Sequence, residues 1–163
     1  MNLPKPRVAA IVVLVASTAL LAGALAFQHL GGYAPCVLCY WQRYAHAATI
    51  VLALVALAVP RAAPLLLAGA GLALLAGAGI AVFHIGVEQH WWQGTAECGS
   101  AIGGAGSIEE LRARLLAQPV VRCDEVAWSL FGVSMAGYNF LASLVLGLLA
   151  VASALTSFRR AAR

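Results

Sequence analysis

The chain has 163 residues, of which 63% are hydrophobic and only 10% are charged, and its mean hydropathy is +0.90. This composition excludes an ordinary soluble domain and indicates a single membrane domain over residues 1–163. The net charge of +4 comes from Lys and Arg residues that are scattered or terminal, without a basic stripe between aromatic residues, so no nucleic-acid partner is expected.

The first apolar segment, residues 8–27, follows a short basic start with Lys5 and Arg7. A helix of about 20 apolar residues crosses the roughly 30 Å of hydrocarbon in a bilayer. A cleaved signal peptide is the alternative, since Ala24-Leu25-Ala26 resembles a cleavage site. The apolar part of such peptides is only about 7–15 residues long, however, so we expect a retained transmembrane helix.

A Cys-x-x-Cys pair, Cys36 and Cys39, precedes the second apolar segment at residues 40–59. If the helix begins near Pro35, both thiols lie in its first turn and Arg43 follows on the same face. A helix N-terminus and a guanidinium both favour the thiolate, which is the reactive form. Because an arginine is costly at a membrane edge, the pattern favours chemistry over a static disulfide or a structural metal site.

Two further apolar segments, residues 65–85 and 133–157, complete four predicted spans. Between them, residues 86–132 form the only long polar segment, which contains all six acidic residues as well as Cys98 and Cys123. This segment is expected to form a loop that carries a second pair of thiols.

A short amphipathic helix is predicted within that loop. Ser107 and Glu110 have the spacing of a capping box, and Ile108, Leu111 and Leu115 follow on one helical face. We expect this helix to lie on the membrane surface, and packing against the rest of the loop is the alternative.

Several other residues of the apolar segments are interpreted as structural. Small residues repeat every four positions from Gly69 to Gly77, which is typical of membrane helices in close contact. We interpret His29, His46 and His84 as interfacial or packing residues.

The positive-inside rule orients the four spans. Six basic residues occur at the start, in the middle turn and in the tail: Lys5, Arg7, Arg61, Arg159, Arg160 and Arg163. These segments, and with them both termini, are therefore expected on the cytoplasmic side. The outward loops, residues 28–39 and 86–132, then place all four cysteines on the oxidising side, where disulfides persist.

Four thiols on one side of a membrane are compatible with two structural disulfides, a four-thiolate zinc site or a redox relay. Zinc sites commonly use two closely spaced pairs, whereas Cys98 and Cys123 are far apart in the chain. A bridge between Cys36 and Cys39 would remove little entropy from the unfolded chain. A bridge between Cys98 and Cys123 would contribute roughly 3–4 kcal/mol, so that pair alone could be structural.

Taken together, these features resemble the disulfide bond formation protein B (DsbB) family, and the resemblance covers essentially the whole chain. It rests on the outward Cys-Val-Leu-Cys at the start of the second of four spans, the nearby arginine, and the second pair in the second outward loop. Other matching residues are Phe27-Gln28-His29, Cys123-Asp124, Trp128, Phe131-Gly132 and Met135. Gln42 departs from the acidic residue that many relatives have before the arginine.

The resemblance implies an all-α integral membrane protein, namely a four-transmembrane-helix bundle with a short amphipathic helix in its second periplasmic loop. It implies a multi-pass location in the bacterial inner membrane, with the cysteines facing the periplasm. The implied activity is that of a quinone-dependent protein dithiol oxidoreductase. Such an enzyme reoxidises a DsbA-like periplasmic thioredoxin-fold protein and passes the electrons to ubiquinone or menaquinone.

The resemblance also implies a role for each cysteine. The reduced partner attacks the Cys98–Cys123 disulfide at Cys98, and the released Cys123 attacks Cys36. Cys39 then passes the electrons to the quinone, which Arg43 holds. A guanidinium suits this role because it is a permanent donor to an oxygen that gains negative charge.

His90 is a further candidate for contact with the quinone, although a histidine beside Trp91 and Trp92 is more often an interfacial anchor. No metal ligand is expected. One alternative is a quinone-linked thiol oxidoreductase of the vitamin K epoxide reductase type, in which the Cys-x-x-Cys belongs near a late span. The other is a non-catalytic, metal-binding membrane protein.

Overall fold

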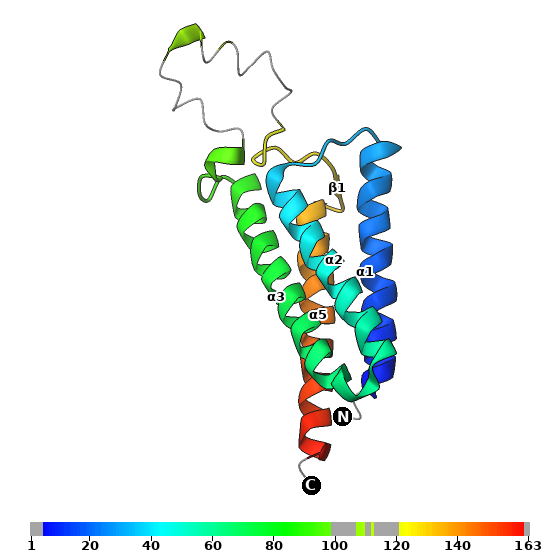
Figure 1. The fold of residues 1–163 in the computed structure, drawn as a ribbon. Helices are drawn as coiled ribbons and strands as arrows, with labels where there is room; N and C mark the ends of the chain where they lie inside the picture. The colour runs from blue at the N-terminus through cyan, green and yellow to red at the C-terminus, as the bar shows by residue number, and fades with distance from the viewer. Residues whose placement is uncertain (1–4, 99–106, 110–111, 113–120, 162–163) are drawn as a thin grey trace.

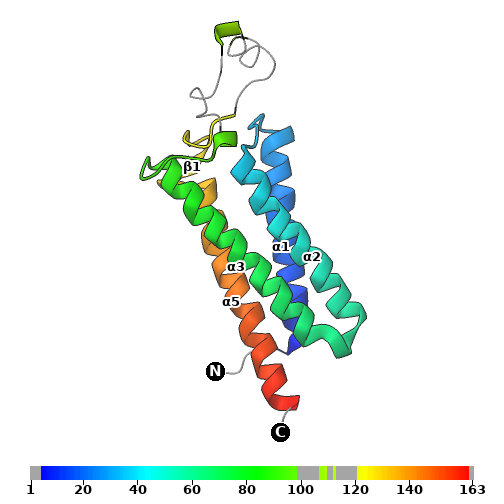
Figure 2. The same ribbon diagram turned by 60° about the vertical axis from the view of Figure 1, so that its left-hand side comes forward.

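The computed structural model describes residues 5–98, 107–109, 112 and 121–161. Four long helices lie side by side in it, and the start of α1 and the end of α5 lie at the same end of the molecule (Figures 1 and 2). The helices are α1 (Pro6–His29), α2 (Val37–Ala58), α3 (Ala63–Glu88) and α5 (Met135–Ala161). The shorter elements are two 3-10 helices, η1 (Pro60–Ala62) and η2 (Ala96–Cys98), and the strands β1 (Ser129–Leu130) and β2 (Val133–Ser134).

Among the described residues, three helical segments are long and apolar enough to cross a membrane: Pro6–His29, Pro60–Glu88 and Met135–Arg160. The structure therefore confirms a mostly helical chain with several candidate membrane spans. Helix α2 is the fourth long helix, and Gln42 and Arg43 near its start lower its mean hydropathy. Its crossing of the membrane remains a prediction.

Helix α3 and the loop after it differ from the sequence-based expectation. The helix continues three residues past position 85, so Glu88 belongs to the helix and is buried. Before α5, an antiparallel hairpin pairs Ser129 with Ser134. Its turn places Phe131 and Gly132 at φ values of 51° and 77°, which reverses the chain tightly. Leu111 and Leu115 of the predicted amphipathic helix lie outside the described residues.

Small residues allow the long helices to approach closely, as the sequence indicates, although the tightest contact lies off the predicted stripe. A Cβ on Gly71 would lie 2.7 Å from a methyl carbon of Val151 and 2.9 Å from the carbonyl oxygen of Gly147. A Cβ on Gly77 would lie 2.8 Å from that of Ala45. Gly71 therefore sets the spacing of α3 and α5, and Gly77 that of α3 and α2.

Gly71→Val is expected to lower the thermal stability of the detergent-solubilised protein, because the added methyl groups would push α3 and α5 apart. Overpacking of this kind costs about 1–3 kcal/mol. Gly79→Val is the matched control in the same helix, since nothing lies within 4 Å of a Cβ at that position. Equal loss of stability in the two variants would contradict this account of the helix contact.

Candidate functional site

Cys36 and Cys39 are held together by the first turn of α2. The helix begins at Val37 rather than near Pro35, and Cys36 is its N-cap, whose sulfur accepts a hydrogen bond from the Cys39 N–H at 3.3 Å. Both cysteines are free thiols, and Cys36 Sγ donates to Cys39 Sγ at 3.0 Å. This hydrogen bond, together with burial, raises the pKa of the Cys36 thiol. This arrangement disfavours a charged Cys36 and leaves Cys39 as the sulfur that accepts the hydrogen bond within the pair.

Arg43 lies one turn further along α2 and reaches across to α1. Its Nη1 donates to Gln28 Oε1 at 2.5 Å, and its Nη2 donates to the Ala24 carbonyl at 3.2 Å. The guanidinium carbon also lies 5.4 Å from the centre of the Tyr40 ring. A guanidinium has five N–H groups, so donors remain for a ligand after these contacts are made.

A cavity of about 410 Å³ adjoins the thiol pair and Arg43. Its other lining residues come mainly from α1, from the loop after it, and from the hairpin and α5, and they include Phe27, Tyr33, Trp128, Leu130 and Tyr138. Trp128 lies between Phe27 and Tyr138 in this wall and makes tilted ring contacts with both. The size and the mostly apolar lining, with a few polar groups, are typical of a small-molecule site.

The second cysteine pair forms a disulfide between Cys98 and Cys123, as the family resemblance implies. Both residues are buried, at 1% and 0% exposure, in one cluster with Cys36, Leu38 and Val87. Residues from α2, α3 and the long loop thus bring the two pairs together at one end of the bundle.

A chain of buried polar side chains runs from the thiol pair into the bundle, and the sequence analysis missed it. Cys36 Sγ lies 3.6 Å from His84 Nε2, and His84 Nδ1 lies 3.0 Å from Gln42 Nε2. Asn139 Nδ2 donates to Gln42 Oε1 at 2.7 Å, and Asn139 Oδ1 lies 2.8 Å from His46 Nε2. His46 and His84 are thus buried packing residues and not interfacial ones, and each also has a polar partner, as buried polar groups generally require.

Glu88 adds a buried carboxyl group to the cavity wall. Its Oε2 accepts a hydrogen bond from the Ser134 hydroxyl at 2.5 Å, and its Oε1 lies 3.8 Å from His84 Nε2. Polar residues inside an apolar segment are the sequence signal that could have drawn attention to His84, Gln42 and Asn139. Glu88 gave no such signal, because the sequence placed it in the polar loop.

His90 does not lie with this group. It follows α3 in a turn with a φ of 59°, and its Nδ1 lies 3.1 Å from the Glu88 carbonyl oxygen. Among the described residues, those that line the cavity include Arg43 and Glu88 but not His90.

Comparisons of the sequence with known proteins identify one family. A family model described as disulfide bond formation protein DsbB matches residues 6–153. A disulfide bond formation protein B from Polaromonas sp. is 32% identical over 151 residues, which cover 88% of this chain and 87% of that protein. An uncharacterized protein from Rickettsia prowazekii is 27% identical over 142 residues, which cover 86% of this chain and 83% of that protein. No solved structure gives a match.

Proposed function

The chain belongs to the disulfide bond formation protein DsbB family, and on that basis we propose that it oxidises a DsbA-like, thioredoxin-fold dithiol protein of the periplasm and passes the electrons to a membrane quinone. Family membership makes it a membrane protein of disulfide bond formation. The observation that carries the finer proposal is the juxtaposition of two cysteine pairs. One is a buried disulfide, and the other is a free pair beside a cavity that also contains Arg43.

The transfer of electrons between the pairs is a sequence of thiol–disulfide exchanges. A partner thiolate attacks Cys98 Sγ, and the Cys98–Cys123 bond breaks with the electron pair on Cys123. Cys123 then attacks Cys36 of an oxidised Cys36–Cys39 pair, which forms an interloop disulfide and frees Cys39. The partner's second thiolate displaces Cys98, and Cys98 attacks Cys123, which restores their bond and leaves Cys36 and Cys39 reduced.

The cavity suits a quinone ring, because it is mostly apolar and opens beside Cys39 and Arg43. A bound quinone, either ubiquinone or menaquinone, supplies the capacity to accept two electrons and two protons. Cys39 accepts the hydrogen bond within the thiol pair, and the free N–H groups of Arg43 can bind an oxygen that becomes negative. We include Arg43 in this site, whereas a role for His90 stays a prediction that no described contact supports.

The test is the reduction of quinone by a reduced thioredoxin-fold partner in proteoliposomes, with and without the protein. Rapid reduction that requires the protein and is lost in Cys39→Ala would support the proposal. Equal rates with the protein, without it and with Cys39→Ala would refute it.

We also propose that α2 is a fourth span and that both termini are cytoplasmic in the bacterial inner membrane. Lys5, Arg7, Arg159 and Arg160 flank the ends of α1 and α5 that lie together, and the hairpin and the start of α2 lie at the opposite end (Figure 1). This clustering of basic residues at one end is what the positive-inside rule requires of a cytoplasmic face.

After reduction, all four native cysteines are expected to react with a membrane-impermeant thiol reagent from the periplasmic side only. A cysteine introduced near the end of α5 by Ala161→Cys, in a variant without the native cysteines, is the control that should react only from the cytoplasmic side. Labelling of Cys98 from the cytoplasmic side alone would overturn the proposed orientation.

A metal-binding function is the second candidate, because the sulfurs of Cys36 and Cys39 and a ring nitrogen of His84 lie within 4.8 Å of one another. Thiolates and imidazole are zinc ligands. Stoichiometric zinc in the purified protein, without quinone-dependent oxidation, would favour this candidate. The family match favours the DsbB assignment over the vitamin K epoxide reductase type.

A further inference from the structure

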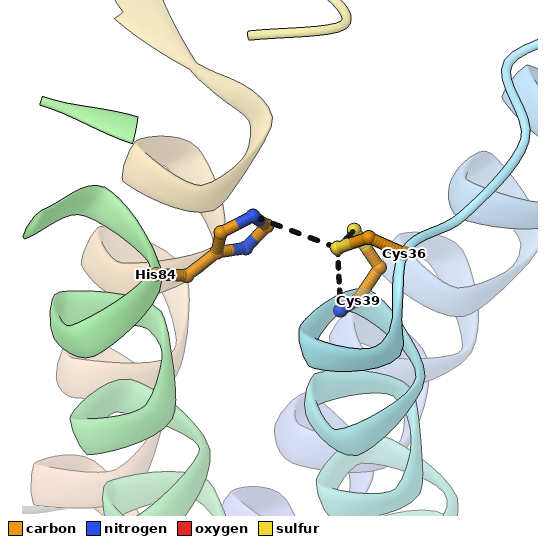
Figure 3. A group of neighbouring side chains, drawn as sticks. All are labelled: Cys36, Cys39 and His84. Atoms are coloured by element: carbon orange, nitrogen blue, oxygen red, sulfur yellow. Dashed lines mark hydrogen bonds between the residues drawn. The ribbon is translucent and has the colours of Figure 1, made fainter. Parts of the chain in front are cut away.

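The His84 ring contacts both cysteine pairs. Its Nε2 lies 3.6 Å from Cys36 Sγ, and the backbone carbonyl of Cys123 is a second acceptor near the ring N–H. The side chain projects from α3 toward the start of α2, where Cys36 and Cys39 lie (Figure 3). His84 is only 4% exposed, so its hydrogen bonds are with the protein.

The surrounding hydrogen bonds determine which nitrogen of His84 carries the proton. Gln42 Nε2 lies 3.2 Å from the Leu38 carbonyl oxygen, which can only accept, so this atom is the NH₂ group of the amide. The opposite end of the amide, Oε1, accepts from Asn139 Nδ2 at 2.7 Å, which fixes the same orientation. The NH₂ group also meets His84 Nδ1 at 3.0 Å, and because it has no lone pair to offer, Nδ1 must be the acceptor. Neutral His84 therefore carries its hydrogen on Nε2.

We propose that His84 donates a hydrogen bond from Nε2 to the Cys36 sulfur, and that the Gln42 amide holds the ring in the tautomer that makes this possible. The role in catalysis rests on the proposed function. When Cys98 attacks Cys123 of the interloop disulfide, the Cys98–Cys123 bond forms and the Cys36–Cys123 bond breaks. The electron pair of the broken bond then stays on Cys36, where the Nε2–H stabilises it.

Other charged groups near His84 make such a donor important. Glu88 Oε1 lies 3.8 Å from the same nitrogen, and Cys39 Sγ lies 3.0 Å from Cys36 Sγ. Negative charge on either group opposes the formation of a Cys36 thiolate. Arg43 lines the same cavity, but its guanidinium is directed toward Gln28 and the Ala24 carbonyl on α1, and no hydrogen bond to Cys36 is found for it among the described residues. His84 is the donor that faces Cys36 from α3.

The first test uses protein in which Cys36 is the only thiol, made by Cys39→Ala, Cys98→Ala and Cys123→Ala. The rate of alkylation by iodoacetamide is measured against pH. His84→Leu should slow alkylation at neutral pH by about 10-fold or more and move the profile to higher pH, as loss of a hydrogen bond to a charged group predicts. His84→Gln, which keeps an N–H donor at a similar reach, should recover most of the rate. Equal profiles for the wild-type side chain and both variants would overturn the proposal.

The second test needs no substitution at His84. Nitrogen-15 NMR of the histidine rings in the detergent-solubilised protein should show neutral His84 with its proton on Nε2, and Gln42→Leu should convert this signal to a mixture of tautomers. A proton on Nδ1 in the unmodified protein would overturn the proposal even if His84→Leu failed to fold. Neither test uses the partner or a quinone, so their outcomes are independent of the quinone-reduction assay.

Discussion

Cys98→Ala is expected to abolish oxidation of the partner protein while quinone still reoxidises the reduced Cys36–Cys39 pair. The two pairs lie in different loops, and only the first pair adjoins the cavity with Arg43. Without Cys98 the partner has no Cys98–Cys123 disulfide to attack, so steady-state turnover should fall by about 1,000-fold or more, as on removal of other covalent catalysts.

Two assays separate these steps. The first follows oxidation of the reduced partner, and the second follows a single reoxidation of the chemically reduced first pair by quinone. Cys98→Ala with Cys123→Ala is the matched control for the second assay, since it prevents Cys123 from forming a bridge with Cys36. Because the lost disulfide also stabilises the fold by roughly 3–4 kcal/mol, the amount of folded protein is measured in parallel. If quinone failed to reoxidise the Cys36–Cys39 pair in a well-folded variant with Cys98→Ala and Cys123→Ala, the two-step relay would be disproved.

Arg43→Ala is expected to weaken the apparent affinity for quinone by roughly 10- to 150-fold, which corresponds to the loss of one charge-assisted hydrogen bond. Oxidation of the partner in a single turnover should change far less, because the hydrogen bonds of Arg43 are with Gln28 and Ala24 on α1 and not with the buried disulfide. Arg43→Lys keeps the charge but loses the planar fork, so its affinity should lie between those of Ala and the native residue.

The structure provides a control for a purely structural role of Arg43. Gln28→Leu removes the partner of Nη1 but keeps the guanidinium and its contact with the Ala24 carbonyl. It should weaken quinone affinity less than Arg43→Ala, although both variants loosen the contact between α1 and α2. Native affinity in Arg43→Ala, or a loss that only follows the amount of folded protein, would reduce Arg43 to an anchor between these helices.

The long helices could be predicted from the sequence because each contains a long apolar run, and among the described residues three of them are long and apolar enough to cross a bilayer. Their ends were harder to predict, because local contacts decide them. Helix α3 extends to Glu88, where the carboxyl group contacts Ser134, and no apolar pattern records that contact. The tight turn at Phe131 likewise depends on backbone angles that its side chain does not indicate.

The site could be predicted in part. The Cys36–Cys39 pair and Arg43 are recognisable because their spacing places them at a helix start, and the Cys98–Cys123 bond follows from the family resemblance. The link between Gln42 and His84 could not be predicted, since these residues are 42 positions apart and meet only when α2 and α3 pack in a particular rotation. A lone polar residue in an apolar run reveals that it needs a partner, but not which partner.

The burial of the Cys98–Cys123 bond has a consequence for selectivity. A protein that passes electrons from thiols to a membrane acceptor loses oxidising capacity if any small thiol in its compartment can reduce its disulfide. Attack on a disulfide requires a thiolate to approach a sulfur directly, and Cys98 and Cys123 are buried in a cluster with side chains that include Val87 and Val121. A thiol carried by a docked protein that displaces this cover would then react much faster than a free small thiol, which protects the bond from reduction by the surrounding small reductants.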